Sequence, residues 1–244
     1  MATRSGFTLI ELLVVVTILV VLLALLAPAI DKAMGFAMEA RCLSNLHQIG
    51  VALRMYTGDH RGYFPPKLKP GTTTGGVFIN GFAVPETLTV SSFWWVGTAG
   101  TNEKWATAGA DVRYLNRYLG HANSAPTTPV PIAFCPGDTE EGQYVKAGTS
   151  YSSNHHNGMS SLMARGTGES YAAIKISRVL NGSRLVAGAD GPGVAAGWNN
   201  AYKPSWHRPE THALLFVDAH ATMETMAWGL RSGASYTFDE TGRE

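Results

Sequence analysis

The feature that most constrains this chain is an uncharged apolar run near its N-terminus. From Leu12 to Ile30 the sequence reads LLVVVTILVVLLALLAPAI, a stretch of 19 residues in which Thr17 is the only polar side chain. A helix rises about 1.5 Å per residue, so this run nearly spans the hydrocarbon core of a bilayer, which is about 30 Å thick. Phe7 to Ile10 extend the run. The sequence therefore predicts one membrane-spanning helix over residues 7–30.

Two ordinary interpretations of this segment compete. Ala27, Pro28 and Ala29 form the A-x-A arrangement of a secretory cleavage site, but the run is longer than the roughly 7 to 15 apolar residues of a secretory signal. A plain signal anchor explains the length but not the carboxylate of Glu11 at the start of the run. A carboxylate at membrane depth costs on the order of a few kcal/mol, so Glu11 should have a partner. Arg4, ahead of the run, favours a cytoplasmic N-terminus.

The residues GFTLIE, from Gly6 to Glu11, resemble position by position the cleavage and methylation signature of type IV prepilins and type II secretion pseudopilins. The resemblance implies a leader of residues 1–6, cleavage after Gly6 by a prepilin peptidase, and N-methylation of the new terminus at Phe7. It also implies that Glu11, fifth in the mature chain, pairs with the terminal amine of a neighbouring subunit. That amine would be the partner that the carboxylate needs.

Pro28 lies inside the predicted helix. A proline there removes one backbone hydrogen bond and normally kinks or breaks the helix, at a cost of about 3 kcal/mol. Pilins that the sequence resembles have a proline at the matching place, so we expect a bend or local melting near Ala24 to Pro28. The alternative is that the helix ends there, at the membrane exit.

Helical periodicity continues beyond the apolar run and predicts an amphipathic stalk over residues 31–58. Gly58 and Asp59 provide a stop signal, so one long helix is expected from Phe7 to Thr57. The expected apolar stripe consists of Phe36, Ala40, Leu43, Leu46, Ile49, Leu53 and Tyr56, and the polar residues expected off it are Glu39, Arg41, Asn45, Gln48 and Arg54.

From residue 59 the composition shifts to Gly, Pro, Thr, Ser and aromatic residues, which predicts a β-rich globular head over residues 59–228. The expected fold class is α+β: a long helix packed on an antiparallel sheet with long loops. Asp111 to Leu119 is expected to form a short helix, and residues 229–244 a polar, flexible tail. The expected strands are Gly76–Val84, Leu88–Val96, Ile174–Ile176, Arg184–Ala189 and Ala213–Val217.

The chain has two cysteines, Cys42 in the stalk and Cys135 in the head. Both would lie outside the cytoplasm, and an even count in an oxidising compartment favours a disulfide. Such a bond would close a loop of about 90 residues and stabilise the fold by about 4 kcal/mol in the chain-entropy model. Two buried, unpaired thiols are the alternative.

A second resemblance covers the head. Residues 40–50, Cys135-Pro136 and the segment from His207 to His220 look like the large prepilin-type family with an H-X9-DG domain. In this chain ten residues separate His207 from Asp218, and Ala219 stands where that family has glycine.

Four residues of the head are candidate metal ligands: Asp190, His207, Asp218 and His220. Carboxylates and imidazoles bind divalent cations, and calcium is the first ion to test because it prefers oxygen ligands. The competing interpretation is that Asp190 and Asp218, which follow apolar runs, order turns by accepting nearby backbone N–H groups. His155 and His156 are adjacent in a loop and make a poor chelate.

Composition and motifs exclude several function classes. The formal net charge is +1, with no block of like charge, so nucleic acid binding is not expected. The chain has no G-x-S-x-G, phosphate-binding glycine loop, paired-cysteine zinc motif or H-E-x-x-H, so neither enzymatic activity nor a cofactor is expected.

The sequence therefore predicts a structural subunit: inserted in the inner membrane, with its head in the periplasm, and assembled through its N-terminal helix into a pilus or secretion pseudopilus. Its expected partners are identical or homologous subunits, the prepilin peptidase and the assembly machinery. Three alternatives stay open: a pilus-borne adhesin that binds glycans through tryptophans 94, 95, 198 and 206, a monomeric membrane-anchored periplasmic protein, and a metal-dependent enzyme with His207 and Asp218 in one pocket.

Overall fold

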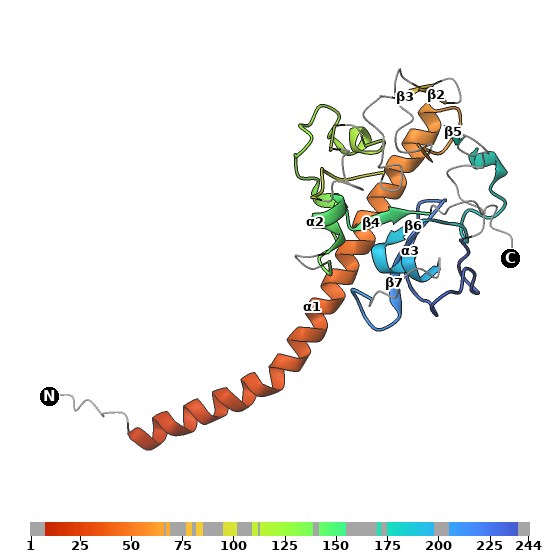
Figure 1. Ribbon diagram of the computed structural model, residues 1–244. Helices are drawn as coiled ribbons and strands as arrows, with labels where there is room; N and C mark the ends of the chain where they lie inside the picture. Colours follow the sequence, from red (N-terminus) through yellow and green to blue (C-terminus); the bar gives the residue numbers. More distant parts are fainter. Residues whose placement is uncertain are drawn as a thin grey trace. The chain divides into compact units, whose positions relative to one another are not determined.

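The computed structural model describes residues 8–65, 67–68, 77–79, 82–84, 95–101, 109–111, 113–138, 142–154, 170–171, 175–197 and 205–238. The chain divides into two compact units, Met1–Ala37 and Met38–Glu244. Helix α1, Leu9–Asp59, contributes to both units and is 51 residues long (Figure 1). The predicted long helix is thus confirmed, with an end two residues later than expected.

The helix is unbroken at Pro28, which lies inside α1. A bend or local melting was expected near Ala24 to Pro28, with a helix end as the alternative. Local melting and a helix end are wrong, because α1 continues through these residues, and the bend stays a prediction. A proline removes only one N–H from the backbone ladder, so the turns on either side can keep their hydrogen bonds.

The head is built on a four-stranded antiparallel sheet with the order β4-β6-β7-β8. Its strands are β4 (Tyr151–Ser153), β6 (Val186–Asp190), β7 (Thr211–Phe216) and β8 (Ala221–Thr225). Two further antiparallel pairs are β1 (Lys67–Leu68) with β5 (Ser170–Tyr171), and β2 (Val77–Ile79) with β3 (Phe82–Val84). The short helices are α2 (Gln143–Ala147), α3 (Gly191–Gly197) and the 3-10 turns η1 (Asn116–Leu119), η2 (Pro131–Ala133) and η3 (Ile176–Arg178).

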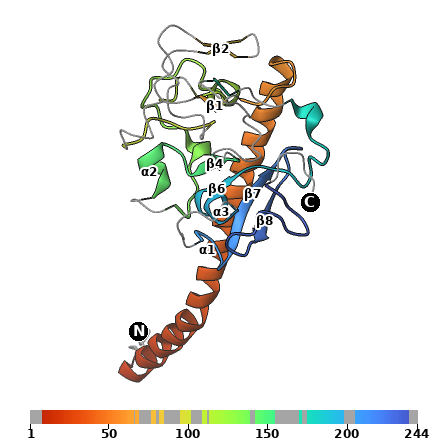
Figure 2. The same cartoon turned by 45° about the vertical axis from the view of Figure 1, so that its right-hand side comes forward.

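The sheet is covered on both faces (Figure 1 and Figure 2). One face packs against the second half of α1 in a core that includes Cys42, Leu46, Ile49, Leu53, Tyr56, Ala187, Ala213 and Leu215. The other face packs against α3 and the segment of Tyr236 and Phe238, in a core that includes Val186, Ala189, Leu214, Phe216, Val194, Ala196, Tyr236 and Phe238. The α+β prediction, a helix on an antiparallel sheet, is therefore confirmed.

The regular alternation of side chains between the two faces of the sheet is interrupted in β6, at an irregularity between Val186 and Gly188. Ala187 contributes to the core against α1, whereas Val186 and Ala189 both contribute to the core against α3. An inserted residue breaks the alternation of a strand in this way. The bulge thus sets the register in which Asp190 ends the strand.

Several expected elements differ from those in the structure. The two predicted strands at Arg184–Ala189 and Ala213–Val217 match β6 and β7 to within a few residues, but β4, β8 and α3 were not predicted. The expected strand at Gly76–Val84 is instead the short pair β2 and β3, and Trp95 and Val96 are not in a strand. Ile176 begins the 3-10 turn η3, and among the described residues from Asp111 to Leu119 only those of η1 are helical. Residues 88–94 and 174 lie outside the described residues.

The predicted flexible tail is wrong for residues 229–238. Phe238 is fully buried, and Tyr236 packs with it in the second core. Thr237 donates its backbone N–H to Arg184 O at 2.8 Å and accepts that of Val186 at 2.9 Å. The segment reads as polar, yet two aromatic side chains provide enough apolar surface to hold it on the sheet. Residues 239–244 lie outside the described residues.

The amphipathic stripe of α1 also differs from the prediction. Glu39 and Asn45, expected off the stripe, are buried, and Phe36, expected on it, is 58% exposed. Asn45 Nδ2 donates to Phe134 O at 2.8 Å and to the Tyr151 hydroxyl at 3.3 Å. A polar side chain that finds hydrogen bonds can be buried at low cost, and hydropathy alone does not detect this.

Gly50 packs closely against β7 and the β7–β8 turn. A Cβ at this position would lie 2.7 Å from Leu215 Cδ1 and 2.9 Å from Ala219 Cα. We expect Gly50→Ala to lower the free energy of unfolding of the head by about 1 to 3 kcal/mol through overpacking.

Denaturant unfolding followed by tryptophan fluorescence measures this change, because all six tryptophans lie in the head. Gly35→Ala is the matched control, since a Cβ at Gly35 meets nothing within 4 Å. Equal stability of the two variants would contradict the close packing.

Buried tyrosines should make the head sensitive to alkali. Burial raises the pKa of Tyr56, Tyr114 and Tyr151 above the ordinary value of 10.0. Above pH 10.0 the unfolded chain releases tyrosine protons that the folded chain keeps, so the free energy of unfolding falls as pH rises. Burial also lowers the pKa of Arg113 from 12.5 to about 9, which makes the free energy of unfolding rise with pH. This is one group, whereas three tyrosines lower the free energy of unfolding as pH rises.

Tyr114→Phe should reduce this slope. The Tyr114 hydroxyl is buried and has no hydrogen-bond partner among the described residues, so its removal should leave stability at pH 8 unchanged or higher. Denaturant unfolding across the alkaline range measures both effects. A slope equal to that of the wild type would contradict the assignment to Tyr114.

Candidate functional site

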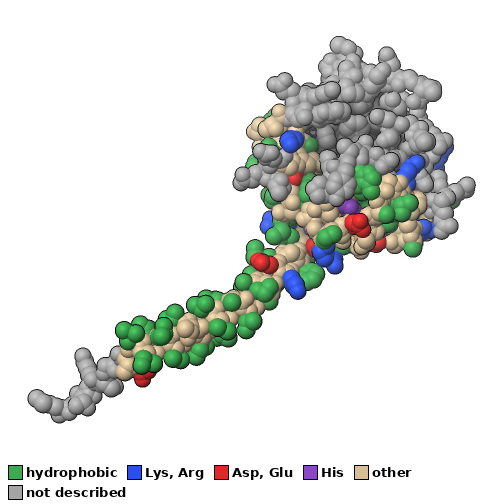
Figure 3. Space-filling model, turned by 60° about the horizontal axis from the view of Figure 1, so that its bottom comes forward, with side chains coloured by type: hydrophobic (Ala, Val, Ile, Leu, Met, Phe, Trp, Pro, Cys, Tyr) green, Lys and Arg blue, Asp and Glu red, His purple; other side chains and the backbone are tan. Residues whose placement is uncertain are grey.

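The first half of α1 presents apolar side chains to its surroundings. The large hydrophobic residues from Leu9 to Ile30 are between 47% and 80% exposed, and the most apolar window of the helix has no buried residue. Figure 3 shows hydrophobic side chains along this whole segment. The helix is long and apolar enough to cross a membrane. Such a surface is unfavourable in water, so it requires lipid or another protein around it.

Thr8 and Glu11 form a reciprocal cap at the start of this helix. Glu11 Oε2 accepts the Thr8 backbone N–H and the Thr8 hydroxyl, both at 2.8 Å, and the Glu11 N–H donates to Thr8 Oγ1 at 3.2 Å. This is the S/T-x-x-E capping box, in which each side chain satisfies a backbone donor that the helix leaves unpaired. The spacing was visible in the sequence, but its capping role was not predicted. Glu11 thus has a partner within its own chain, and it remains exposed.

The predicted disulfide between Cys42 and Cys135 is confirmed. Both residues are fully buried, and the bond joins positions 93 residues apart. Asp138 orders the loop beyond Cys135, because its carboxylate accepts the Ser150 hydroxyl and two backbone N–H groups at the start of α2. The bond attaches the β-rich part of the head to α1.

Asp190 lies at the end of β6 and is fully buried. Its Oδ1 accepts the Gly193 N–H at 2.6 Å, which caps α3, and its Oδ2 accepts the Ala213 N–H of β7 at 2.9 Å. His212 Nδ1 lies 3.5 Å from Oδ1, and His207 Nε2 lies 3.7 Å from Oδ2. A buried carboxylate with two backbone donors is a structural tie between three elements, β6, α3 and β7.

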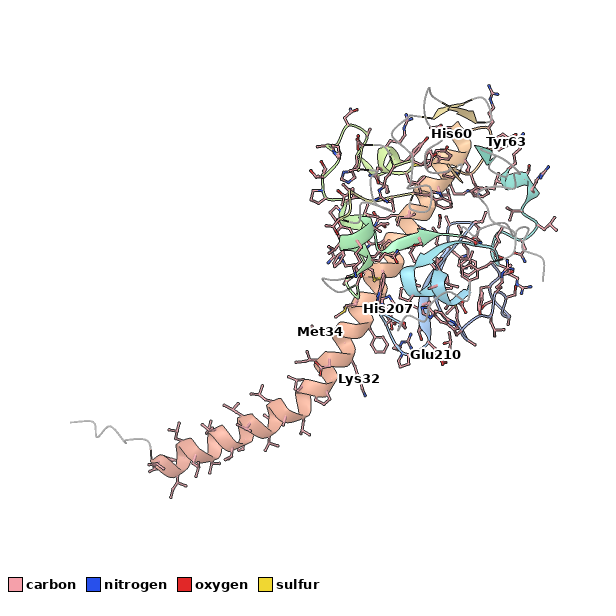
Figure 4. All side chains as sticks on the ribbon, viewed as in Figure 1. Lys32, Met34, His60, Tyr63, His207 and Glu210 are labelled. Carbon is pink, nitrogen blue, oxygen red and sulfur yellow. A yellow bond between two sulfur atoms is a disulfide. The ribbon has the colours of Figure 1, made fainter. Side chains whose placement is uncertain are left out.

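His207 lies beside α1, against the disulfide (Figure 4). Its side chain is 1% exposed, and Nε2 lies 3.6 Å from Cys135 Sγ. Burial lowers the pKa of His207, against the opposing influence of the Asp190 and Glu39 carboxylates. A lowered pKa keeps the imidazole neutral near pH 7.

Glu39 and Arg208 form an ion pair that the sequence did not predict. Arg208 Nε donates to Glu39 Oε1 at 2.8 Å, and Arg208 Nη2 donates to Oε2 at 3.1 Å. The hydrogen bond to Glu39 raises the pKa of Arg208. The two residues are 169 positions apart, so no local pattern could reveal the pair.

The four predicted metal ligands fall into two separate pairs. Asp190 and His207 lie in the interior, whereas Asp218 and His220 lie in the exposed β7–β8 turn. Asp218 Oδ1 accepts the His220 N–H at 3.1 Å and lies 2.6 Å from His220 Nδ1. Among the described residues, no three of these four bring ligand atoms within 4.8 Å of one another. Calcium binding by either pair stays a prediction.

The N-terminal segment matches a known family model. Residues 1–27 match the prokaryotic N-terminal methylation motif. The chain carries a prepilin-type signature. No curated protein and no solved structure matches the chain.

The prepilin-type signature confirms the first resemblance, and together with the apolar half of α1 it fits a protein of the pilin or pseudopilin type. It is also consistent with membrane anchoring. Gly6 and Phe7, the predicted cleavage and methylation positions, lie outside the described residues. So do His155, His156, Trp94 and Trp198, while Trp95 is buried and Trp206 is partly buried in the first core.

Proposed function

We propose that this protein is a filament subunit of the pilus or pseudopilus type. It is inserted in the inner membrane by the first half of α1, cleaved after Gly6, methylated at Phe7 and assembled through that helix. The observation that carries the proposal is the match of residues 1–27 to the methylation motif, a range that includes most of the exposed apolar stretch of α1.

Assembly is driven by burial of apolar surface. When the helix leaves the lipid, its exposed leucines, isoleucines and valines must be covered, and identical helices provide a surface of the same kind. Each fully buried side chain of this type contributes about 1.5 to 3 kcal/mol relative to water. Contacts between the apolar stretches hold neighbouring helices together but do not fix how far one helix is shifted along the next. A polar contact is therefore needed to set the stagger between subunits.

Glu11 can set that stagger. Its carboxylate is exposed and is held by Thr8 in the isolated chain, where the capping box keeps it hydrogen-bonded. In a filament the terminal amine of a neighbouring Phe7 would offer a charged partner in an environment without water. An ion pair of this kind is much stronger at low dielectric than in water. If the Glu11 carboxylate gave up its hydrogen bonds with Thr8 and paired with the amine, one stagger between neighbouring subunits would be favoured.

Mass spectrometry of the chain tests processing. The chain is produced in a host with an active prepilin peptidase, and the intact mass and N-terminal peptide are measured. We expect loss of Met1 to Gly6 and one added methyl group on Phe7. A chain that begins at Ile30 would identify an ordinary secreted protein, and a chain that keeps Met1 to Gly6 would leave only a membrane anchor.

Filament imaging of a Glu11→Gln variant tests assembly separately. The variant keeps the shape of the side chain and an acceptor for Thr8, but it loses the charge. We expect normal cleavage together with loss of filaments. Filaments of normal number from the variant would contradict the registration role, and absence of filaments from the wild type would contradict the assembly proposal while leaving processing intact.

A further inference from the structure

Three side chains at the junction of α1 and the head are grouped like the ligands of a metal ion. The ligand atoms of Cys42, Cys135 and His207 all lie within 4.8 Å of one another, and no other group of three His, Cys, Asp or Glu side chains in the described residues does so. In the structure the two sulfurs are joined as a disulfide. They stand in for the two thiolates that reduction would produce.

The spacing of these atoms fits a tetrahedral zinc ion. With Zn–S bonds of about 2.3 Å and Zn–N bonds of about 2.0 to 2.1 Å, tetrahedral angles place sulfur and nitrogen ligands about 3.5 to 3.6 Å apart. His207 Nε2 lies 3.6 Å from Cys135 Sγ. The Cα atoms of the two cysteines are 5.3 Å apart, so the sulfurs can separate to a ligand spacing of about 3.8 Å by side-chain rotation.

The surroundings favour a cation. The His207 side chain is 1% exposed, so its imidazole is held in place by packing. The Asp190 carboxylate lies 3.7 Å from Nε2, and its oxygens are fixed by the Gly193 and Ala213 amides. Negative charge next to a buried site lowers the free energy of placing a divalent ion there. Two thiolates, a neutral imidazole and a nearby carboxylate are a donor set that suits zinc.

We propose that the reduced chain binds zinc, or an ion of the same class, through Cys42 Sγ, Cys135 Sγ and His207 Nε2, with water in the fourth position. Reduction by a phosphine consumes one water and yields two thiols and the phosphine oxide. Metal binding then releases both thiol protons to solvent and forms two metal–sulfur bonds, with no change in the oxidation state of the metal.

The metal would close the same chain loop as the disulfide. In an oxidising compartment the sulfurs are bonded to each other, and in a reducing one the ion joins them. The two links exclude each other, because each uses both sulfurs. The head would therefore be tied to α1 under either condition. This inference does not depend on assembly into filaments.

Cobalt is the spectroscopic probe for the test. The full-length chain in detergent micelles is unfolded with guanidinium in the presence of a phosphine reductant and refolded with one equivalent of Co²⁺. We expect near-ultraviolet thiolate-to-cobalt charge-transfer absorption and the strong visible bands of tetrahedral Co²⁺, both removed by added Zn²⁺. The oxidised chain should show neither.

Two histidine variants decide whether the site is the one proposed. His207→Ala should bind Co²⁺ at least about tenfold more weakly than the wild type. Loss of a residue that only hydrogen-bonds a metal ligand already lowers metal affinity by about that factor, and His207 is a ligand itself. His220→Ala, which removes an exposed imidazole, should bind like the wild type. The oxidised His207→Ala chain provides the folding control through its intact disulfide and its tryptophan fluorescence.

Absence of the thiolate charge-transfer band in the reduced wild type would overturn the proposal, whether or not the chain refolds. Equal cobalt affinity of the wild type and His207→Ala would also overturn it, because the ion would then lie elsewhere.

Discussion

Replacement of both cysteines by serine is expected to lower the free energy of unfolding by about 4 to 5 kcal/mol. The bond between Cys42 and Cys135 restricts a loop of 93 residues in the unfolded chain, and the chain-entropy model assigns the largest effects to such long loops. Both residues are fully buried, so serine hydroxyls at these positions would add an unfavourable burial of polar groups.

Denaturant unfolding of the full-length chain in detergent, with a chelator present, measures this effect. The chelator excludes metal as an alternative link between the same positions. The reduced wild type under the same conditions is the control, because it lacks the bond but keeps the thiols. A double variant within about 1 kcal/mol of the oxidised wild type would show that the bond contributes little.

Asp190→Asn is expected to lower the free energy of unfolding by about 3 kcal/mol. The carboxylate accepts the Gly193 and Ala213 amides through its two oxygens, and an asparagine has only one acceptor oxygen. Its NH2 group would face a buried N–H donor, and a buried donor left without a partner costs about 1 to 3 kcal/mol. Loss of the charge also weakens the bond that remains.

Asp218→Asn is the matched control, because Asp218 is exposed in a turn and its replacement still accepts the His220 N–H. We expect this variant to stay within about 0.5 kcal/mol of the wild type. Chemical denaturation and thermal melting of both variants decide the comparison. Equal effects of the two substitutions would mean that the buried carboxylate does not organise the end of β6.

The two variants also address the calcium prediction. A turn and a helix cap need no ion, so added calcium should leave the difference between Asp190→Asn and the wild type unchanged. A calcium-dependent rise in stability that Asp218→Asn removes would favour a metal at the exposed pair.

The head was predicted only in part because its order depends on distant contacts. Strands β6 and β7 contain apolar runs and were predicted, whereas β8 is polar enough to resemble a loop and forms because β7 pairs with it. Residues 229–238 were expected to be flexible, and the buried side chains of Tyr236 and Phe238 show why this expectation was wrong. A segment without a strong preference for β structure can still form a strand, or pack in place, when it contacts another part of the folded chain.

The sequence by itself determined the character of the first 30 residues: a prepilin-type signature and an apolar run. The motif from Gly6 to Glu11 and the apolar run that follows are contiguous, so their meaning does not depend on folding. The disulfide was also predictable, because two cysteines allow only one internal pair.

Only the tertiary structure decided which polar groups the head buries and for what use. Glu39 and Arg208 are 169 positions apart, and His207 is 72 positions from Cys135. Hydropathy assigns Glu39, His207 and Arg208 to the surface or leaves them undecided. The cost of burying a polar group depends on the partner it meets, and that partner is fixed by how the chain packs around α1.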